Sequence, residues 1–281
     1  MNDFTVESRY IVENAKPEAD GMVRTVLFRG FLLCISNALA NVNAAVYELC
    51  GGVVQNGPFA GMRISDEIVW PDGNLSNKCL GSYEFELHPA VKKAIERKPD
   101  TVINAGCAEG YYAVGLGKQL PYSHVYAMDM EEKCLEECAK NAQSNGIINL
   151  VLMHGKVGAQ DLIQGKGHKL FVIDIEGYEL AVLDPMHCPD LLHSDIIVEC
   201  HDFFYVGENE AHTSIISDLL EQRFSPTHDV ERIEPQVPHV KNFPILRGLP
   251  LGASLLAITE KRPLPTAWLA CWAKERGIQS G

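Results

Sequence analysis

The sequence predicts an α/β protein built on an open, mostly parallel sheet with helices on both faces. From residue 100 onward, short apolar runs alternate with helix-forming segments, and alternation at this spacing is typical of strand–helix–strand units. A glycine-containing turn, "INAGCAEGYY" (103–112), follows the first of these runs. Residues 22–50 have a helical pattern, so we expect a helical extension before the sheet.

The expected elements of the sheet follow one another in regular order. A helix, "HPAVKKAIERKPD" (88–100), has Pro89 in its first turn and stops at Pro99. The helices that follow are expected in "GYYAVGLGKQL" (110–120), "EEKCLEECAKNAQSNG" (131–146) and "YELAVLD" (178–184). The strands are expected in "TVINAG" (101–106), "HVYAMD" (124–129), "NLVLMHG" (149–155), "KLFVIDIEG" (169–177) and "DIIVECHD" (195–202).

The C-terminal part is predicted to add an antiparallel edge to the sheet. "FSPTHDVERIE" (224–234) and "ASLLAITEKR" (253–262) have strand-like patterns and are expected to pair as a hairpin. The tail, "TAWLACWAKERG" (266–277), is predicted to be a short amphipathic helix. Trp268 and Trp272, four residues apart, would then pack on the domain.

Composition and charge limit the class of partner. The chain has 281 residues, of which 46% are hydrophobic and 22% charged, so it can bury a full core. A net charge of -13 with no basic run argues against nucleic acid as a partner and suits a small cationic or neutral ligand.

The cysteines and the N-terminal residues indicate where the protein is expected to be located. Nine cysteines without a C-x-x-C pair are expected to be reduced thiols in a cytoplasmic protein. The acidic start of the chain does not resemble a signal peptide. The most apolar window, 31–50, is interrupted by Asn37, Asn41 and Asn43, so we interpret it as a buried or interface helix and expect no membrane span.

The glycine turn points to a nucleoside-containing ligand other than a dinucleotide. Its spacing is Gly106-x-x-x-Gly110, and the other two positions of G-x-G-x-x-G hold Ala108 and Tyr111. No GK[ST] follows, so the P-loop pattern fails as well. Asp129 ends the second strand, where a carboxylate accepts hydrogen bonds from both ribose hydroxyls.

Two longer segments give the sequence a family resemblance. "TVINAGCAEGYYAVGLGKQLPYSHVYAMDM" (101–130) resembles the first two motifs of class I S-adenosylmethionine-dependent methyltransferases, and "LFVIDIEGYELAVLD" (170–184) is similar to the D-x-E-G-x-E-x-x-V-L motif of their FkbM-type branch. "NGPFAGM" and "LGSYEFEL" resemble segments that precede the cofactor loop in that group, so the resemblance covers about residues 55–205. It implies a Rossmann-like, seven-stranded, mostly parallel sheet with a C-terminal antiparallel hairpin, and S-adenosylmethionine as cofactor.

The resemblance also assigns residues to the parts of the cofactor. Asn104 departs from the family pattern, because many relatives have an acid there; its amide still forms hydrogen bonds. The assignments place Asn104, Gly106, Ala108 and Gly110 at the methionine end, Asp129 at the ribose, Met130 on the adenine, Lys156 and Val157 at the adenine edge, and Tyr83 and Glu84 over the methionine moiety. Asp174 is also expected to bind the cofactor.

Polar residues end the fourth and fifth strands, and ligands of parallel sheets bind beyond such ends. Asp174 is expected to position an acceptor hydroxyl or amine, and His201 is the candidate general base because an imidazole titrates near neutral pH. Glu199 lies two residues from His201, on the same strand face, and completes the predicted catalytic set. Glu176 is interpreted as a cap of the following helix.

Two other interpretations of these residues stay open. Asp174, Glu199 and His201 have the ligand types that Mg²⁺, Mn²⁺ or Fe²⁺ accept, although spacing alone does not favour a metal. Alternatively, Glu199 and His201 form a buried hydrogen-bonded pair that holds a loop.

The sequence thus predicts an S-adenosylmethionine-dependent methyltransferase that acts on a small molecule, with oxygen as the favoured acceptor atom. Residues 1–80 are expected to form a helical lid or homodimer surface, and residues 81–281 the methyltransferase domain. No nucleic-acid or membrane partner is expected. The alternatives are an enzyme of the same fold that binds the cofactor for a different reaction, and a non-catalytic binding or regulatory protein.

Overall fold

A seven-stranded sheet forms the centre of the described chain. The computed structural model describes residues 21–67, 74–202, 215–262 and 266–274, with only the backbone for residues 21–35. The strand order is β3-β2-β1-β4-β5-β7-β6; the first five strands are parallel, and β7 is antiparallel to both β5 and β6. The predicted Rossmann-like sheet with a C-terminal antiparallel pair is confirmed. The strands are β1 (Thr101–Ala105), β2 (His124–Asp129), β3 (Leu150–His154), β4 (Lys169–Ile173), β5 (Asp195–Cys200), β6 (His228–Ile233) and β7 (Ala267–Ala273).

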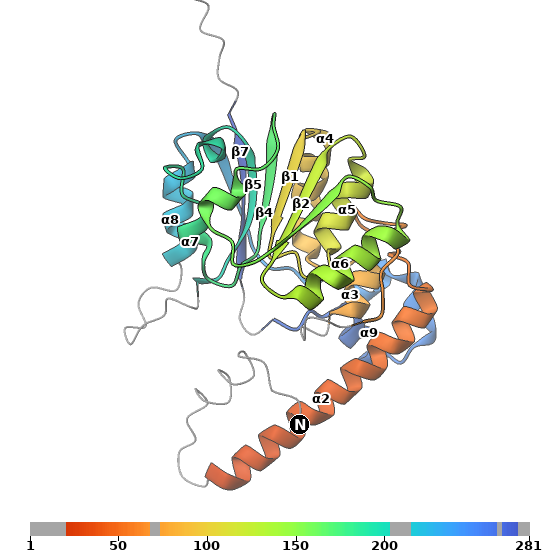
Figure 1. The fold of residues 1–281 in the computed structure, drawn as a ribbon. Helices are drawn as coiled ribbons and strands as arrows, with labels where there is room; N and C mark the ends of the chain where they lie inside the picture. The colour runs from red at the N-terminus through yellow and green to blue at the C-terminus, as the bar shows by residue number, and fades with distance from the viewer. Residues whose placement is uncertain (1–20, 68–73, 203–214, 263–265, 275–281) are drawn as a thin grey trace, which may run out of the picture.

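Helices cover both faces of the sheet (Figure 1). Successive strand residues point to opposite faces, so Val102 belongs to a core shared with α4, α5 and α6, whereas Ile103 belongs to a second core shared with α7 and α8. The helices are α2 (Gly21–Cys50), α3 (Leu75–Leu80), α4 (His88–Glu96), α5 (Tyr111–Gln119), α6 (Glu132–Ser144), α7 (Glu179–Val182), α8 (Ile215–Phe224) and α9 (Leu251–Ile258). Short 3₁₀ helices are η1 (Phe85–Leu87), η2 (Ala159–Leu162), η3 (Pro189–Leu192), η5 (Val240–Asn242) and η6 (Pro244–Gly248).

The C-terminal hairpin uses different segments from those predicted. β6 lies within the predicted segment 224–234, but its partner is β7, which was predicted as a helix. Segment 253–262 overlaps α9 instead of forming a strand. The run "AWLACWA" is apolar on both faces because β7 lies between two strands under helices. Such short continuous apolar runs do not distinguish a buried strand from a helix. Trp268 and Trp272 share one strand face and are buried in the first core.

The N-terminal extension joins the first core at its C-terminal end. α2 confirms the helix predicted for 22–50, and Val42, Val46 and Cys50 recur at four-residue spacing on its buried face. This part of α2 contacts α3 and α9, and Figure 1 shows the rest of the helix extending beyond the sheet. Among the described residues, no helix has the length and apolar character needed to cross a membrane.

A buried carboxylate at the start of β5 ties three parts of the fold together. Asp195 Oδ2 lies 2.6 Å from Arg97 Nε and 2.8 Å from His168 Nε2, and its Oδ1 accepts a hydrogen bond of 3.0 Å from the Ala273 amide. Burial acts to raise the pKa of Asp195, but the hydrogen bonds from His168 and Arg97 outweigh it and lower the pKa.

We expect Asp195→Ala to reduce the free energy of unfolding by about 3 kcal/mol, because it leaves the partners of a buried carboxylate unpaired. Because its folded pKa is depressed, Asp195 stabilises the fold fully above its unfolded pKa of about 3.9 and less as pH falls toward the folded pKa. Urea unfolding from pH 7 to 3 should therefore show that the stability difference between the wild type and Asp195→Ala becomes smaller below about pH 4.

The exposed Asp218, which pairs with Arg232, provides the control, and Asp218→Ala should lower the free energy of unfolding by less than about 1 kcal/mol. Equal losses in the two variants would contradict the interpretation.

Candidate active site

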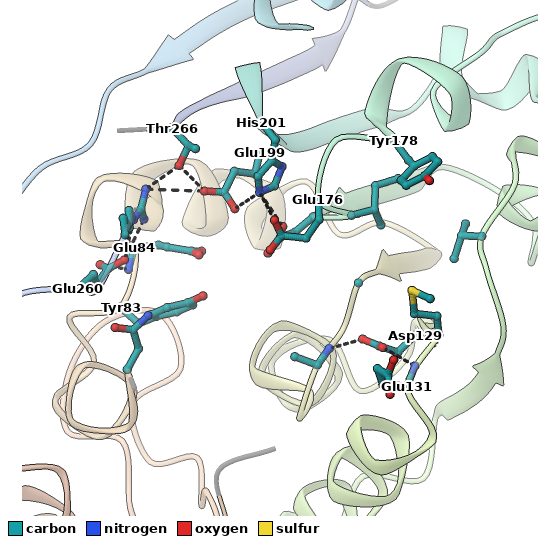
Figure 2. Close-up of a pocket in the computed structure, with 18 of the residues that line it drawn as sticks. Tyr83, Glu84, Asp129, Glu131, Glu176, Tyr178, Glu199, His201, Glu260 and Thr266 are labelled. Carbon is teal, nitrogen blue, oxygen red and sulfur yellow. Dashed lines mark hydrogen bonds and ion pairs between the residues drawn. The ribbon is translucent and has the colours of Figure 1, made fainter. Parts of the chain in front are cut away.

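A cavity of about 310 Å³ opens at the carboxyl ends of β1, β2, β4 and β5. This size is within the usual range of small-molecule sites. Figure 2 shows Asp129 and Glu131 on one side, Tyr83, Glu84 and Glu260 on the opposite side, and the residues that end β4 and β5 between them. The lining residues are Asn74, Lys78, Tyr83, Glu84, Gly106, Ala108, Asp129, Met130, Glu131, Gly155, Lys156, Val157, Asp174, Ile175, Glu176, Tyr178, Glu199, His201, Glu260, Lys261, Arg262 and Thr266.

The glycine turn passes directly against the end of β4. Gly106 has φ +75°, and a Cβ there would lie 1.6 Å from the carbonyl oxygen of Asp174. Only glycine fits this close approach, which brings the turn and Asp174 to one edge of the cavity. Ala108, also at positive φ (+46°), donates its amide proton to Asp129 Oδ2 at 2.9 Å.

Asp129 is held by backbone groups on both oxygens. Its Oδ1 accepts a hydrogen bond of 2.9 Å from the Glu131 amide, opposite the bond from Ala108. A carboxylate accepts about four hydrogen bonds, so Asp129 keeps capacity for two hydroxyl groups. Met130, 63% exposed, lies beside it and offers an apolar surface at this end of the cavity.

Two of the residues assigned to the cofactor lie behind the cavity lining. Asn104 is buried, and its amide nitrogen donates to the carbonyl oxygen of Val172 at 3.2 Å. A Cβ on Gly110 would lie 2.5 Å from Cys138 Sγ, so this glycine lets the turn pack on α6. The other assigned residues line the cavity: Tyr83, Glu84, Gly106, Ala108, Asp129, Met130, Lys156, Val157 and Asp174.

Glu84 lies opposite Asp129 in a constrained position. Its backbone has φ +47°, its amide donates to Glu260 Oε1 at 2.7 Å, and the Tyr112 hydroxyl donates to its carboxylate. Burial raises the pKa of Glu84 well above its ordinary value, Glu199 adds to the shift, and Arg262 opposes it. A carboxyl group in this state gains charge readily when a cation approaches.

Arg262 joins the acids of this wall. Its guanidinium lies 2.9 Å from carboxylate oxygens of Glu86 and Glu260 and 3.8 Å from Glu199 Oε1. Burial raises the pKa of Glu260 to about 7, although Arg262 acts to lower it. The Thr266 hydroxyl donates to Glu199 Oε1 at 2.5 Å. Glu84 and Glu199 were expected from the sequence. Glu260, Arg262 and Thr266 were not, because segment 253–262 was predicted to be an edge strand and segment 266–277 a helix.

His201 lies among four carboxylates. Its Nδ1 is 2.7 Å from Oε1 of the fully buried Glu179, an oxygen that also accepts a hydrogen bond from the Gly177 amide. The His201 Nε2 atom lies 3.6 Å from Asp174 Oδ1, 3.4 Å from Glu176 Oε2 and 3.7 Å from Glu199 Oε2 (Figure 2). The structure therefore brings together the predicted Asp174, Glu199 and His201 and adds Glu176 and Glu179.

The electrostatics of this group favour the imidazolium form. Burial acts to lower the pKa of His201, but Glu199, the hydrogen bond with Glu179 and Asp174 outweigh it and raise the pKa well above its ordinary value. Burial, followed by Glu199, raises the pKa of Asp174 well above its ordinary value.

Glu176 does not cap α7 as predicted. The helix begins after Tyr178, which forms no side-chain cap bond, and the Glu176 carboxylate lies near His201 instead. Glu176 has φ +52°, and this backbone conformation accompanies the turn toward the cavity. Asp202 accepts hydrogen bonds from Ser217 at the start of α8, away from Glu199, as the strand alternation predicts.

A comparison with known protein families finds a match to part of the chain. Residues 96–173 match the family model described as a methyltransferase domain, a segment that includes β1 to β4, the glycine turn and Asp129. This match confirms the predicted enzyme class, an S-adenosylmethionine-dependent methyltransferase, and S-adenosylmethionine as its cofactor. It does not extend to the FkbM-type branch, the acceptor or the atom that is methylated. A search of curated proteins finds no match to the chain.

Solved structures give distant likenesses. An O-methyltransferase from Streptomyces achromogenes is 12% identical, with 96% of this chain and 100% of that chain covered at a TM-score of 0.44. An O-methyltransferase from Bacillus cereus is 12% identical, with 95% and 96% covered at 0.45. An rRNA methylase from Streptococcus thermophilus is 14% identical, with 68% and 97% covered at 0.44. Identities and TM-scores this low say nothing about the acceptor.

Proposed function

We propose that the protein transfers a methyl group from S-adenosylmethionine to a small-molecule acceptor, with oxygen as the favoured acceptor atom. The observation that supports this most is that Asp129, Asp174, Glu199 and His201 all line one cavity. The carboxylate proposed to bind the ribose and the group proposed to take the proton thus face the same cavity.

The chemistry of the cavity lining supports S-adenosylmethionine as the ligand. Asp129 has acceptor capacity for ribose hydroxyls, and the exposed Met130 provides an apolar surface for adenine. Glu84 and Asp174 offer carboxyl groups to the cationic methionine end. Gly106 keeps the turn free of a side chain between these two regions.

The residues beyond the methionine end have to hold the acceptor and manage one proton. S-adenosylmethionine, when bound, supplies a methyl carbon activated by its sulfonium. Asp174 is placed to orient an acceptor hydroxyl, and the group of Asp174, Glu199 and His201 receives its proton. The carboxylates outnumber the cations here, so the group attracts a proton rather than repelling it.

Three further features belong to this proposal. We assign the chain to the FkbM-type branch, because the D-x-E-G-x-E motif places three acids in and around the His201 group. Residues 1–80 would act as a lid or a homodimer surface, supported by Asn74 and Lys78, which line the cavity. A cytoplasmic location remains a prediction, supported by the absence of a disulfide among the described cysteines.

Calorimetry with S-adenosylhomocysteine tests the cofactor part of the proposal. We expect the wild-type protein to bind S-adenosylhomocysteine and not NAD. Asp129→Ala should weaken binding by about 1.5–3 kcal/mol, the range for lost hydrogen bonds to a charged group. Asp129→Asn, which keeps one acceptor oxygen, should lose less.

The exposed Glu132, one turn further along the chain and outside the cavity lining, provides the control. Glu132→Ala should bind like the wild type. Unchanged affinity in a folded Asp129→Ala protein would exclude the ribose assignment.

A further inference from the structure

We propose that Asp174, Glu176 and His201 bind a divalent metal ion of the Mg²⁺ or Mn²⁺ type at the acceptor end of the cavity. The site deepens the proposed function and rests on it, because the ion would lie where the acceptor hydroxyl is expected. It differs from the metal site considered from the sequence, which included Glu199 and omitted Glu176.

The first argument is the geometry of the three side chains. Each offers one ligand atom, and the three atoms lie within 4.8 Å of one another. Neighbouring ligands of an octahedral ion with bonds of about 2.1 Å are separated by about 3.0 Å. The His201 Nε2 atom lies 3.4 Å from Glu176 Oε2 and 3.6 Å from Asp174 Oδ1, so both distances are within a few tenths of an ångström of that spacing.

The second argument is a buried oxygen that lacks a hydrogen bond. Asp174 Oδ1 is inaccessible to solvent and accepts no hydrogen bond from any residue that the structure describes. This oxygen faces His201 Nε2 at 3.6 Å, which exceeds hydrogen-bond length. Buried acceptors without a hydrogen bond are costly, and a cation beside Asp174 Oδ1 would compensate this oxygen.

The third argument is the support behind His201. Histidines that bind metals almost always donate their other ring N–H to a carboxylate or carbonyl. The Nδ1 atom of His201 has such a partner in the fully buried Glu179, at 2.7 Å. Glu179 is itself fixed by the Gly177 amide, so Nε2 is the nitrogen directed toward Asp174 and Glu176.

The ligand types indicate which ion would bind. Carboxylate oxygens suit Mg²⁺ and Mn²⁺, and the imidazole nitrogen favours Mn²⁺ over Ca²⁺, which takes oxygen ligands. Asp174, Glu176 and His201 all line the cavity, so ligand positions toward it remain for the acceptor or for water. An ion there would lower the pKa of a bound hydroxyl.

The test is binding of MnCl₂ to the purified, tag-free full chain in the absence of cofactor, followed by calorimetry and by electron paramagnetic resonance of free Mn²⁺. We expect one Mn²⁺ per chain. Glu176→Gln, at a side chain that is 40% exposed, should weaken binding at least about tenfold. His201→Gln should do the same. His187→Ala, which removes an exposed histidine 2.7 Å from Asp184, should bind Mn²⁺ like the wild type.

Wild-type protein that does not bind Mn²⁺, or a folded Glu176→Gln protein that binds it undiminished, would overturn the metal site. Should His201→Gln not fold, Glu176→Gln decides. S-adenosylhomocysteine binding, measured separately in excess chelator, keeps the two proposals apart. Binding of S-adenosylhomocysteine without Mn²⁺ binding leaves the proposed function standing and the metal site refuted. The reverse result supports the metal site and refutes the proposed function.

Discussion

His201→Ala is expected to lower kcat about 10²–10⁴-fold, the usual cost of removing a group that manages the reacting proton. The imidazole is buried, held by Glu179, and within 3.7 Å of Asp174, Glu176 and Glu199. Its substitution therefore removes the centre of the acid–base group. His201→Gln keeps a hydrogen-bonding side chain without a titrating nitrogen and should be nearly as slow. S-adenosylhomocysteine affinity should barely change, because His201 lies apart from Asp129 (Figure 2) and, in the proposed function, beyond the methionine end of the cofactor.

His187→Ala, at an exposed histidine outside the cavity lining, is the control and should keep full activity. A kcat within a few-fold of wild type in both His201 variants would make His201 a structural residue. So would a loss of activity that merely follows a loss of folding stability. Asp174 would then be the leading candidate for positioning the acceptor.

Activity measured in excess chelator distinguishes two chemical roles for His201, metal ligand and general base. If Asp174, Glu176 and His201 bind a metal ion, activity should disappear in excess chelator and return with Mg²⁺ or Mn²⁺. If His201 is a general base, activity should survive chelation. Its raised pKa would then make kcat increase with pH as the imidazolium loses its proton. Full activity in chelator at every pH would exclude the metal role.

The sequence predicted those site residues whose position depends on local pattern. Asp129 ends β2 and His201 follows β5 because apolar runs mark the strands, and the carboxyl ends of parallel strands meet at one edge. Gly106 was predicted from the glycine spacing of the turn, and its φ of +75° gives the physical reason for a glycine there. Side-chain direction was less predictable. Asn104 lies on the same strand face as the core residue Val102, so its amide nitrogen donates to β4 and the side chain lies behind the cavity lining.

The opposite wall depended on long-range packing that no local pattern encodes. Glu260 and Arg262 follow α9, and Thr266 precedes β7; both elements were assigned to the wrong secondary structure. Arg262 and Thr266 reach Glu199 only when β7 lies between β5 and β6, and this strand order depends on the packing of the whole sheet. Glu176 was missed for a different reason, because its direction depends on one backbone angle, φ +52°.

Gly106→Ala is expected to have the largest effect on stability of any single methyl group added at the site. Alanine at φ +75° costs about 1–2 kcal/mol by itself. The added Cβ would also lie 1.6 Å from the carbonyl oxygen of Asp174, and this backbone atom belongs to the chain leaving β4. Relief of the overlap has to separate the turn from β4, which breaks the hydrogen bond from the Asp174 amide to the Ala105 carbonyl oxygen. We therefore expect a loss of more than about 4 kcal/mol in the free energy of unfolding.

Gly61→Ala is the matched control, because Gly61 has nearly the same φ, +82°, and a Cβ there has no atom within 4 Å. Gly61→Ala should lower the free energy of unfolding by about 1 kcal/mol. The backbone strain of alanine at positive φ is partly offset, because alanine reduces the conformational entropy of the unfolded chain. Urea unfolding gives the free energy lost in each variant. The strain at positive φ is common to both, so the difference between the two losses is the cost of the steric overlap at Gly106 alone. S-adenosylhomocysteine binding should be lost in Gly106→Ala even where folded protein is recovered, because the turn and Asp174 both line the cavity. Equal unfolding free energies in the two variants, with cofactor affinity retained in Gly106→Ala, would show that the turn does not approach β4 this closely and would remove the reason for glycine at this position.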